Sequence, residues 1–93
     1  MTTTLSLSDR PQLRRGVRAS IDPLSQAPIL LFPEGVLFLN ETAAAVIRHC
    51  DGSRTVAEAV QAISEIYDDV AVEDVLSLVT DLVVQRLMVV DHG

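Results

Sequence analysis

Lysine and tryptophan are absent from this sequence of 93 residues, cysteine occurs once, and the only aromatic residues are Phe32, Phe38 and Tyr67. The single cysteine, Cys50, cannot form an internal disulfide. No stretch has the layout of a signal peptide or the uninterrupted apolar length of a membrane span. We therefore expect a cytoplasmic protein that does not contact a membrane and whose interior consists mainly of Val, Leu, Ile and Ala.

Side-chain sets that carry catalysis or hold metals and cofactors are also missing. His49 and Cys50 are neighbours that point about 100° apart on a helix, and no partner residue or metal-ligand spacing accompanies them. The four glycines are dispersed and make no phosphate-binding loop. The acidic run at 68–74 lacks the pattern of an EF-hand. We expect no enzyme, no catalytic residues, no cofactor and no metal, with Cys50 buried as a small apolar residue and His49 near a helix end.

Charge is unevenly distributed along the chain. Residues 1–20 carry four arginines and one acid, for a net charge of +3, whereas the remainder carries three arginines and twelve acids, for −9. An acidic body repels phosphate backbones, so nucleic acid is not the expected partner. Residues 1–15 are rich in Thr, Ser and Arg and are expected to form a flexible arm, either solvated or in contact with an acidic partner.

Residues 16–93 are expected to form one domain, because a chain of this length supports a single small core. Alternation of apolar and polar residues over 17–21 predicts a first strand. The segment "LLFPEGVLFLN" at 30–40 predicts a hairpin of strands 29–32 and 36–39, joined by a three-residue loop that includes Gly35. Together these segments predict a three-stranded antiparallel sheet with its third strand at the edge.

Three helices are predicted after the sheet. Asn40 can cap the first helix. Thr55 and Glu58 have the spacing of a capping box at the start of the second. The third spans about 71–86, and residues 88–90 predict a short closing strand. The fold class is therefore α+β, with a three-stranded antiparallel sheet followed by a three-helix bundle.

Both the third strand and the third helix carry more apolar surface than one contact can bury. The strand is apolar at every position from Val36 to Leu39, so each of its faces needs a cover. On the helix the apolar residues span an arc of about 180°, whereas a stripe of about 100° is usual. We assign to the core Val72, Leu76, Val79, Val83 and Leu87. We assign to an open flank Val75, Leu78 and Leu82, beside Arg86.

If this flank lies along the strand edge, the two surfaces form one groove, and an extended peptide can add to the edge as a further strand. Two other interpretations stay open: the surfaces pack against each other, or a second copy covers the edge in a homodimer. Helices joined by a short turn beside a small sheet also fit a winged-helix DNA-binding regulator. Against it, the third helix carries Glu73, Asp74 and Asp81 with Arg86 as its only cation.

Several motifs resemble those of one known family. They are Pro11 and Leu13 followed by "GVR" at 16–18, "LLFPEGVLFLN" at 30–40, "CDGSRTV" at 50–56 and "EDV...V..L" from Glu73 onward. In this order and spacing they resemble the PqqD family of pyrroloquinoline quinone biosynthesis over about residues 10–90. The chain departs from the family at Leu87, where many relatives have a glycine, so the end of the third helix is the point of difference.

The resemblance implies a winged-helix-like domain that acts as a non-catalytic peptide chaperone, a recognition element for a ribosomally made precursor peptide. It implies two partners: a PqqA-like precursor peptide, and a PqqE-like radical S-adenosylmethionine enzyme that joins Glu to Tyr in that peptide. In this class of domains the peptide extends the sheet at the third strand and rests against the third helix. The residues expected to bind it are Val36, Leu37, Phe38, Leu39, Val75, Leu78, Leu82 and Arg86, the last through a peptide carboxylate.

Overall fold

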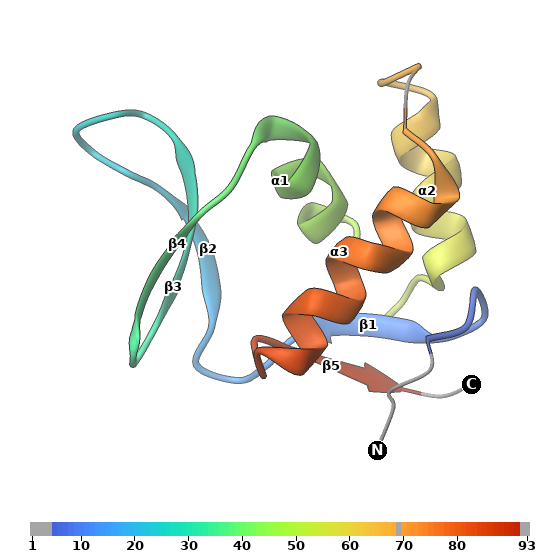
Figure 1. Cartoon of the computed structure of the whole chain (residues 1–93), viewed down its shortest axis with the longest axis horizontal. Helices are drawn as coiled ribbons and strands as arrows, with labels where there is room; N and C mark the ends of the chain where they lie inside the picture. Colours follow the sequence, from blue (N-terminus) through green and yellow to red (C-terminus); the bar gives the residue numbers. More distant parts are fainter. Residues whose placement is uncertain (1–4, 69, 92–93) are drawn as a thin grey trace.

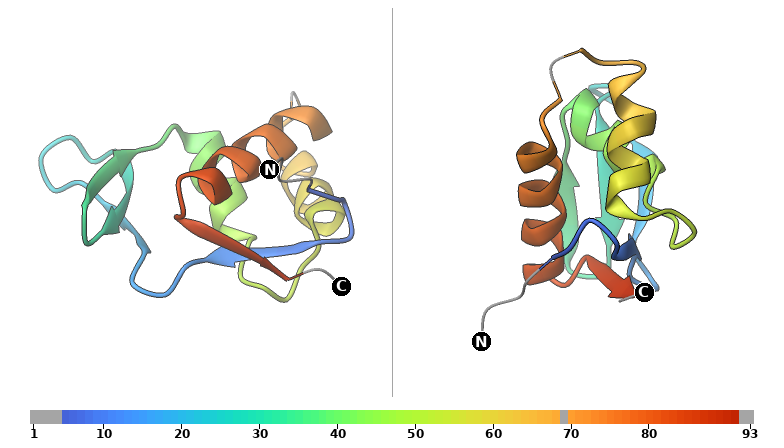
Figure 2. Two further views of the ribbon diagram at one scale, coloured as in Figure 1. Left: turned by 60° about the horizontal axis from the view of Figure 1, so that its bottom comes forward. Right: turned by 90° about the vertical axis from the view of Figure 1, so that its right-hand side faces the viewer.

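The computed structural model describes residues 5–68 and 70–91 of the chain. These residues form strands and helices in the order β1, β2, β3, β4, α1, α2, α3, β5 (Figure 1). A three-stranded sheet lies on one side of the molecule, and α2, α3 and a two-stranded sheet lie on the other, with α1 between them (Figures 1 and 2). The predicted α+β class is confirmed.

The three-stranded sheet consists of β2 (Arg18–Ile21), β3 (Pro28–Phe32) and β4 (Gly35–Phe38) in that order, and all its pairs are antiparallel. The predicted hairpin is confirmed, with Ile29 opposite Phe38 and Leu31 opposite Val36. The predicted three-residue loop is wrong. Gly35 adopts a φ of 157° and continues the ladder opposite Phe32, which leaves only Pro33 and Glu34 in the turn.

A second sheet pairs the two ends of the described chain, β1 (Arg10–Leu13) with β5 (Met88–Asp91). The closing strand predicted at 88–90 is thereby confirmed. The flexible arm predicted over 1–15 is corrected: residues 10–13 are a strand, and the backbone N–H of Val56 donates to the carbonyl of Asp9 at 2.9 Å. Local sequence gives no sign of this strand because its partner lies at the opposite end of the chain. Residues 1–4 of the predicted arm lie outside the described residues.

The helices are α1 (Glu41–Arg48), α2 (Val56–Ser64) and α3 (Val72–Val84). The predicted caps are confirmed for the first two. Asn40 Oδ1 accepts the N–H of Ala43 at 2.7 Å, and Thr55 and Glu58 exchange the two hydrogen bonds of a capping box at 3.2 and 2.8 Å. These bonds satisfy backbone donors that a helix start leaves unpaired.

One continuous core connects the sheet to the helices. α1 packs against β2 and β3 and also against α2, which in turn packs against α3, and α3 contacts β5. Leu30, Val46, Ile63 and Val79 are almost completely buried along this path. Because β4 is the last strand in the order β2, β3, β4, one of its long edges pairs with no other strand of the described residues.

Candidate functional site

The outer edge of β4 has main-chain hydrogen-bonding groups that face away from the sheet. The N–H of Leu39 donates to the carbonyl of Pro28 at 2.9 Å, so residues 35, 37 and 39 direct their backbone groups toward β3. Backbone direction alternates along an antiparallel strand, and the N–H and C=O of Val36 and Phe38 therefore point outward. Among the described residues no strand pairs with this side of β4. The strand is an open edge of the kind that accepts another strand.

The two faces of β4 differ in burial, although the sequence is apolar on both. Leu37 and Leu39 are half-buried and pack against the core, whereas Val36 is 49% and Phe38 is 62% exposed. An exposed phenylalanine beside an exposed valine is a small apolar patch next to the free backbone groups. The face of β4 that carries Val36 and Phe38 is thus still without a cover among the described residues, as the sequence predicts.

The helix flank predicted to face this edge is only partly open. Val75 and Leu82 are each 1% exposed and belong to the core, so their assignment to an open flank is wrong, as is the assignment of Val72, which is 37% exposed, to the core. The reason is that α3 is covered on two sides, by α2 and by β5, which turns the 75–82 face inward. Val79 and Leu87 are buried as predicted. Of the predicted flank, Leu78 stays half-exposed.

Arg86 terminates α3 in a left-handed conformation with φ of 63°. The N–H of Leu87 donates to Leu82 O at 2.8 Å and the N–H of Arg86 donates to Val83 O at 3.0 Å, the two bonds of a Schellman motif. Buried Leu87 then follows as its hydrophobic anchor. The exposed Arg86 side chain leaves the helix at this end. The left-handed residue is thus Arg86 itself, one position before Leu87.

An ion pair that the sequence does not predict links the hairpin turn to the residue that follows β1. Arg14 Nη2 lies 3.6 Å from Glu34 Oε1, and the backbone N–H of Arg14 donates to the carbonyl of Leu87 at 2.9 Å. Glu34 is in the turn that leads into β4, so these contacts tie the β4 hairpin to the residue that follows α3. The opposite charges are 20 positions apart in the chain, a separation at which no sequence pattern indicates a pair.

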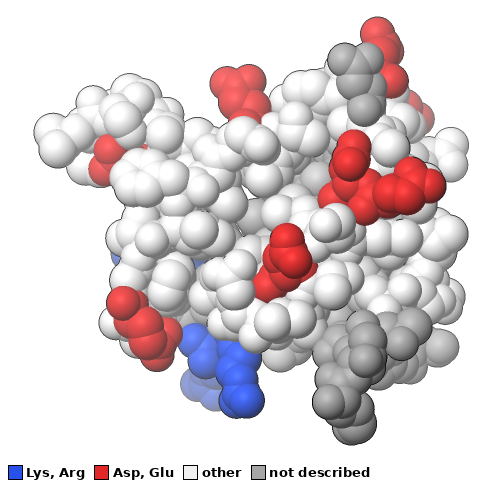
Figure 3. All heavy atoms as spheres, viewed as in Figure 1, with Lys and Arg blue, Asp and Glu red and all other residues white. Residues whose placement is uncertain are grey.

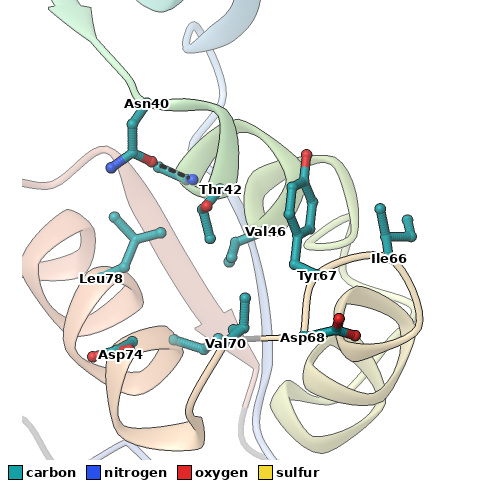
Figure 4. Close-up of a pocket in the computed structure, with 11 residues that line it drawn as sticks. Asn40, Thr42, Val46, Ile66, Tyr67, Asp68, Val70, Asp74 and Leu78 are labelled. Atoms are coloured by element: carbon teal, nitrogen blue, oxygen red, sulfur yellow. Dashed lines mark hydrogen bonds between the residues drawn. The ribbon is translucent and has the colours of Figure 1, made fainter.

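At its other end β4 leads into a pocket of about 600 Å³ (Figure 4). Three segments form it: the start of α1 with Asn40 and Thr42, the α2–α3 connection with Tyr67 and Val70, and the first half of α3 with Leu78. Asn40 is two residues beyond the end of β4. The pocket therefore begins just beyond the C-terminal end of β4, toward the helices.

The pocket combines apolar walls with acidic groups. The side chains of Val46, Val70 and Leu78 and the ring of Tyr67 line it, and the exposed carboxylates of Asp68 and Asp74 stand at its border (Figure 4). The face of the molecule that shows α3 carries several acidic side chains, whereas the basic ones visible there gather at the lower edge (Figure 3). No function is predicted from the sequence for the acids at 68–74. The one available signal is that the only tyrosine directly precedes them.

The buried thiol and the helix-end histidine have structural environments. Cys50 is 3% exposed, as predicted, and burial raises the pKa of its thiol to about 12, so it stays protonated at neutral pH. His49 is the C-cap residue of α1, and its Nδ1 lies 2.8 Å from Ala45 O. Within residues 5–68 and 70–91, no three His, Cys, Asp or Glu side chains are grouped as metal ligands. No helix in the same ranges has the length and apolar character needed to cross a membrane.

Known proteins match the chain across this site. The family model described as Coenzyme PQQ synthesis protein D (PqqD) matches residues 29–88. A protein of Azotobacter vinelandii named PqqA binding protein is 44% identical over 73 residues, which cover 76% of this chain and 79% of that protein. The Bifunctional coenzyme PQQ synthesis protein C/D of Methylorubrum extorquens is 36% identical over 89 residues, which cover 92% of this chain and 24% of that protein.

A solved structure matches the fold. It is the solution NMR structure of the PqqD truncation of Methylobacterium extorquens PqqCD, described as a functional and stand-alone recognition element for ribosomally synthesized and post-translationally modified peptides. The TM-score is 0.80 at 33% identity, and the match covers 94% of this chain and 96% of that one. The family match over 29–88 contains β4 and all of α3.

Proposed function

The chain belongs to the PqqD family, and from that premise we propose that it binds a PqqA-like precursor peptide by adding it as a strand to β4. In this proposal the protein is a non-catalytic chaperone of pyrroloquinoline quinone biosynthesis in the cytoplasm. The names of its relatives support the ligand, because several are PqqA binding proteins. The observation that carries the binding mode is the outward-facing backbone of Val36 and Phe38 beside their exposed side chains.

The size of this edge supports a reversible complex. Two residues with outward N–H and C=O groups can make four main-chain hydrogen bonds. Four such bonds at about 1 kcal/mol each and roughly 300 Å² of apolar burial at about 25 cal/mol per Å² total about 11 kcal/mol. Association costs about 4 kcal/mol or more, which leaves an expected affinity in the micromolar range or weaker. Such a complex suits a carrier that must release its peptide.

The side chains proposed to contact the peptide are Val36, Leu37, Phe38 and Leu39 of β4, Leu78 of α3, and Arg86. Val75 and Leu82 are not included, because each is 1% exposed, although Val75 lies among the residues that line the pocket. We propose that the bound peptide is presented to a PqqE-like radical S-adenosylmethionine enzyme, which joins Glu to Tyr in it. We also propose that the domain is winged-helix-like. Exposed Glu73, Asp74 and Asp81 on α3 argue against the use of that helix on DNA.

Titration of isotope-labelled protein with the precursor peptide tests the binding mode. We expect the backbone amide signals of β4 and of the exposed side of α3 to shift, with those of Val36 and Phe38 moving most. Shifts confined to α1 and α2 would refute strand addition at β4. Addition of the enzyme to the complex should then change a second set of amides if the peptide is presented while bound.

A second candidate function uses the same edge for a homodimer. It is favoured by the exposure of Val36 and Phe38, because a second copy of β4 would cover the same apolar patch. Light scattering at micromolar concentration, with and without peptide, separates the two functions. A dimer that dissociates when peptide is added indicates one shared surface, whereas a dimer that persists in the saturated complex places self-association elsewhere.

A further inference from the structure

The pocket lies just beyond the C-terminal end of β4. Its border begins at Asn40, directly after Leu39, and its opposite wall includes Leu78 of α3. The following inference rests on the proposed function, because a peptide must occupy the β4 edge for its neighbouring residue to reach the pocket. Figure 4 shows Leu78 and Asn40 on facing sides of this opening.

The direction of the added strand determines which part of the peptide meets the pocket. Every pair in the β2–β3–β4 sheet is antiparallel, and a strand that continues this pattern runs opposite to β4. Its N-terminal side then lies beside the C-terminal end of β4, where the pocket begins. At about 3.3 Å per residue, a side chain that enters the pocket belongs to a residue within about three positions before the segment paired with β4.

The lining of the pocket selects a particular kind of side chain. The interior walls are apolar, formed by Val46, Val70 and Leu78 with the ring of Tyr67, and they suit an aliphatic stem. Asp68 and Asp74 at the border are both acidic, and none of the lining residues is an arginine. A flexible stem with a cation at its tip satisfies both features, and an aromatic ring nearby favours such a cation further.

We propose that this pocket holds the side chain of a lysine or arginine located just N-terminal to the peptide segment paired with β4. The stem contacts Val70 and Leu78, and the cationic head lies between Asp68 and Asp74. This contact fixes the register of the peptide on an edge whose main-chain hydrogen bonds do not read sequence. It also orients the peptide, because only one end of β4 leads into the pocket.

Affinity measurements with altered peptides test this site. The probe is the fluorescently labelled PqqA-like precursor peptide of the same organism, together with copies in which each lysine is replaced by norleucine or each arginine by citrulline, one at a time. We expect one replacement, ahead of the paired segment, to weaken binding about 3- to 10-fold at low salt. The protein variant Asp68→Asn with Asp74→Asn should weaken binding of the unaltered peptide by a similar factor. The protein and peptide changes combined should cause little further loss.

A matched control separates this contact from the general negative charge of the chain. Glu65→Gln with Asp91→Asn removes two exposed acids that do not line the pocket, and it should leave affinity within about twofold. The proposal would be overturned if both double variants lost the same affinity for the peptide, or if replacement of every basic peptide residue weakened binding equally. It would also be overturned if the precursor peptide had no basic residue before the paired segment. If the backbone amide signals of β4 shift but no replacement of a basic peptide residue weakens binding, only the pocket assignment fails. If they do not shift, strand addition fails as well.

Discussion

Substitution of Val36 by proline is the most direct perturbation of strand addition. Proline has no backbone N–H, and the N–H of Val36 points away from β3, so the change removes a donor from the open edge without removing a bond of the existing ladder. Proline is tolerated on edge strands for this reason. Gly35, the preceding residue, has no Cβ with which the proline ring could clash. We therefore expect the fold of Val36→Pro to persist.

The expected loss of affinity follows from the lost hydrogen bond. Removal of one donor costs about 1 kcal/mol when water can replace it, and about 3 kcal/mol when a peptide carbonyl is left unpaired in the complex. Peptide binding should therefore weaken about 5- to 150-fold. Fluorescence anisotropy with the labelled precursor peptide measures this loss, and circular dichroism at the same temperature verifies the fold.

Two further variants control the interpretation. Val36→Thr keeps the N–H and the branched shape, and should bind the peptide within a few fold of the original protein. Leu37→Pro removes a donor directed at β3, and should destabilise the sheet itself. The reasoning is refuted if folded Val36→Pro binds as tightly as Val36→Thr. Equal losses in both would assign the binding to the valine side chain rather than to the backbone.

Three other predictions concern stability and reactivity. Arg86→Gly should raise the free energy of unfolding by about 1 kcal/mol and Tm by about 4–8 °C in thermal melts, because glycine takes the left-handed φ of 63° without a Cβ clash. As a control, Gln85→Gly should lower both quantities, because Gln85 has an ordinary φ of −77°. The hydrogen bond from Thr55 N–H lowers the pKa of Glu58 below its ordinary value of 4.5. The ionised Glu58 carboxylate therefore stabilises the fold above that pH, and this stabilisation disappears as the pH falls through the lowered pKa. Thermal melts from pH 7 to pH 3 should show Glu58→Gln less stable than the original protein at neutral pH and equal to it in acid. Cys50, buried and with its pKa raised to about 12, should react with a thiol reagent only after unfolding in denaturant, and rapid labelling of the native protein would contradict this burial.

Features encoded within a few residues are the ones that the sequence predicts well. The hairpin follows from a turn between two apolar runs, and the start of α2 follows from Thr55 and Glu58, because each signal and its consequence lie within one turn of chain. The free position of β4 at the sheet edge follows from strand order alone, since the chain enters α1 directly after it.

Features that depend on distant segments are missed or misplaced. Strand β1 needs β5 as a partner, and no pattern within residues 10–13 reveals it. An apolar arc of about 180° on α3 does not indicate which half is buried; β5 and α2 together decide this, and they bury Val75 and Leu82. The pocket beside Asn40 is built from three separate segments, so its volume and acidic border become visible only when these are brought together in space.

The pairing of β1 with β5 has a mechanical consequence. Arg10 lies opposite Asp91, so the first residue of one strand meets the last residue of the other, and both strand ends leave from the same corner. This corner lies across the molecule from the β4 hairpin (Figure 1). Tension applied between Arg10 and Asp91 would open this ladder one residue pair at a time instead of shearing its hydrogen bonds together.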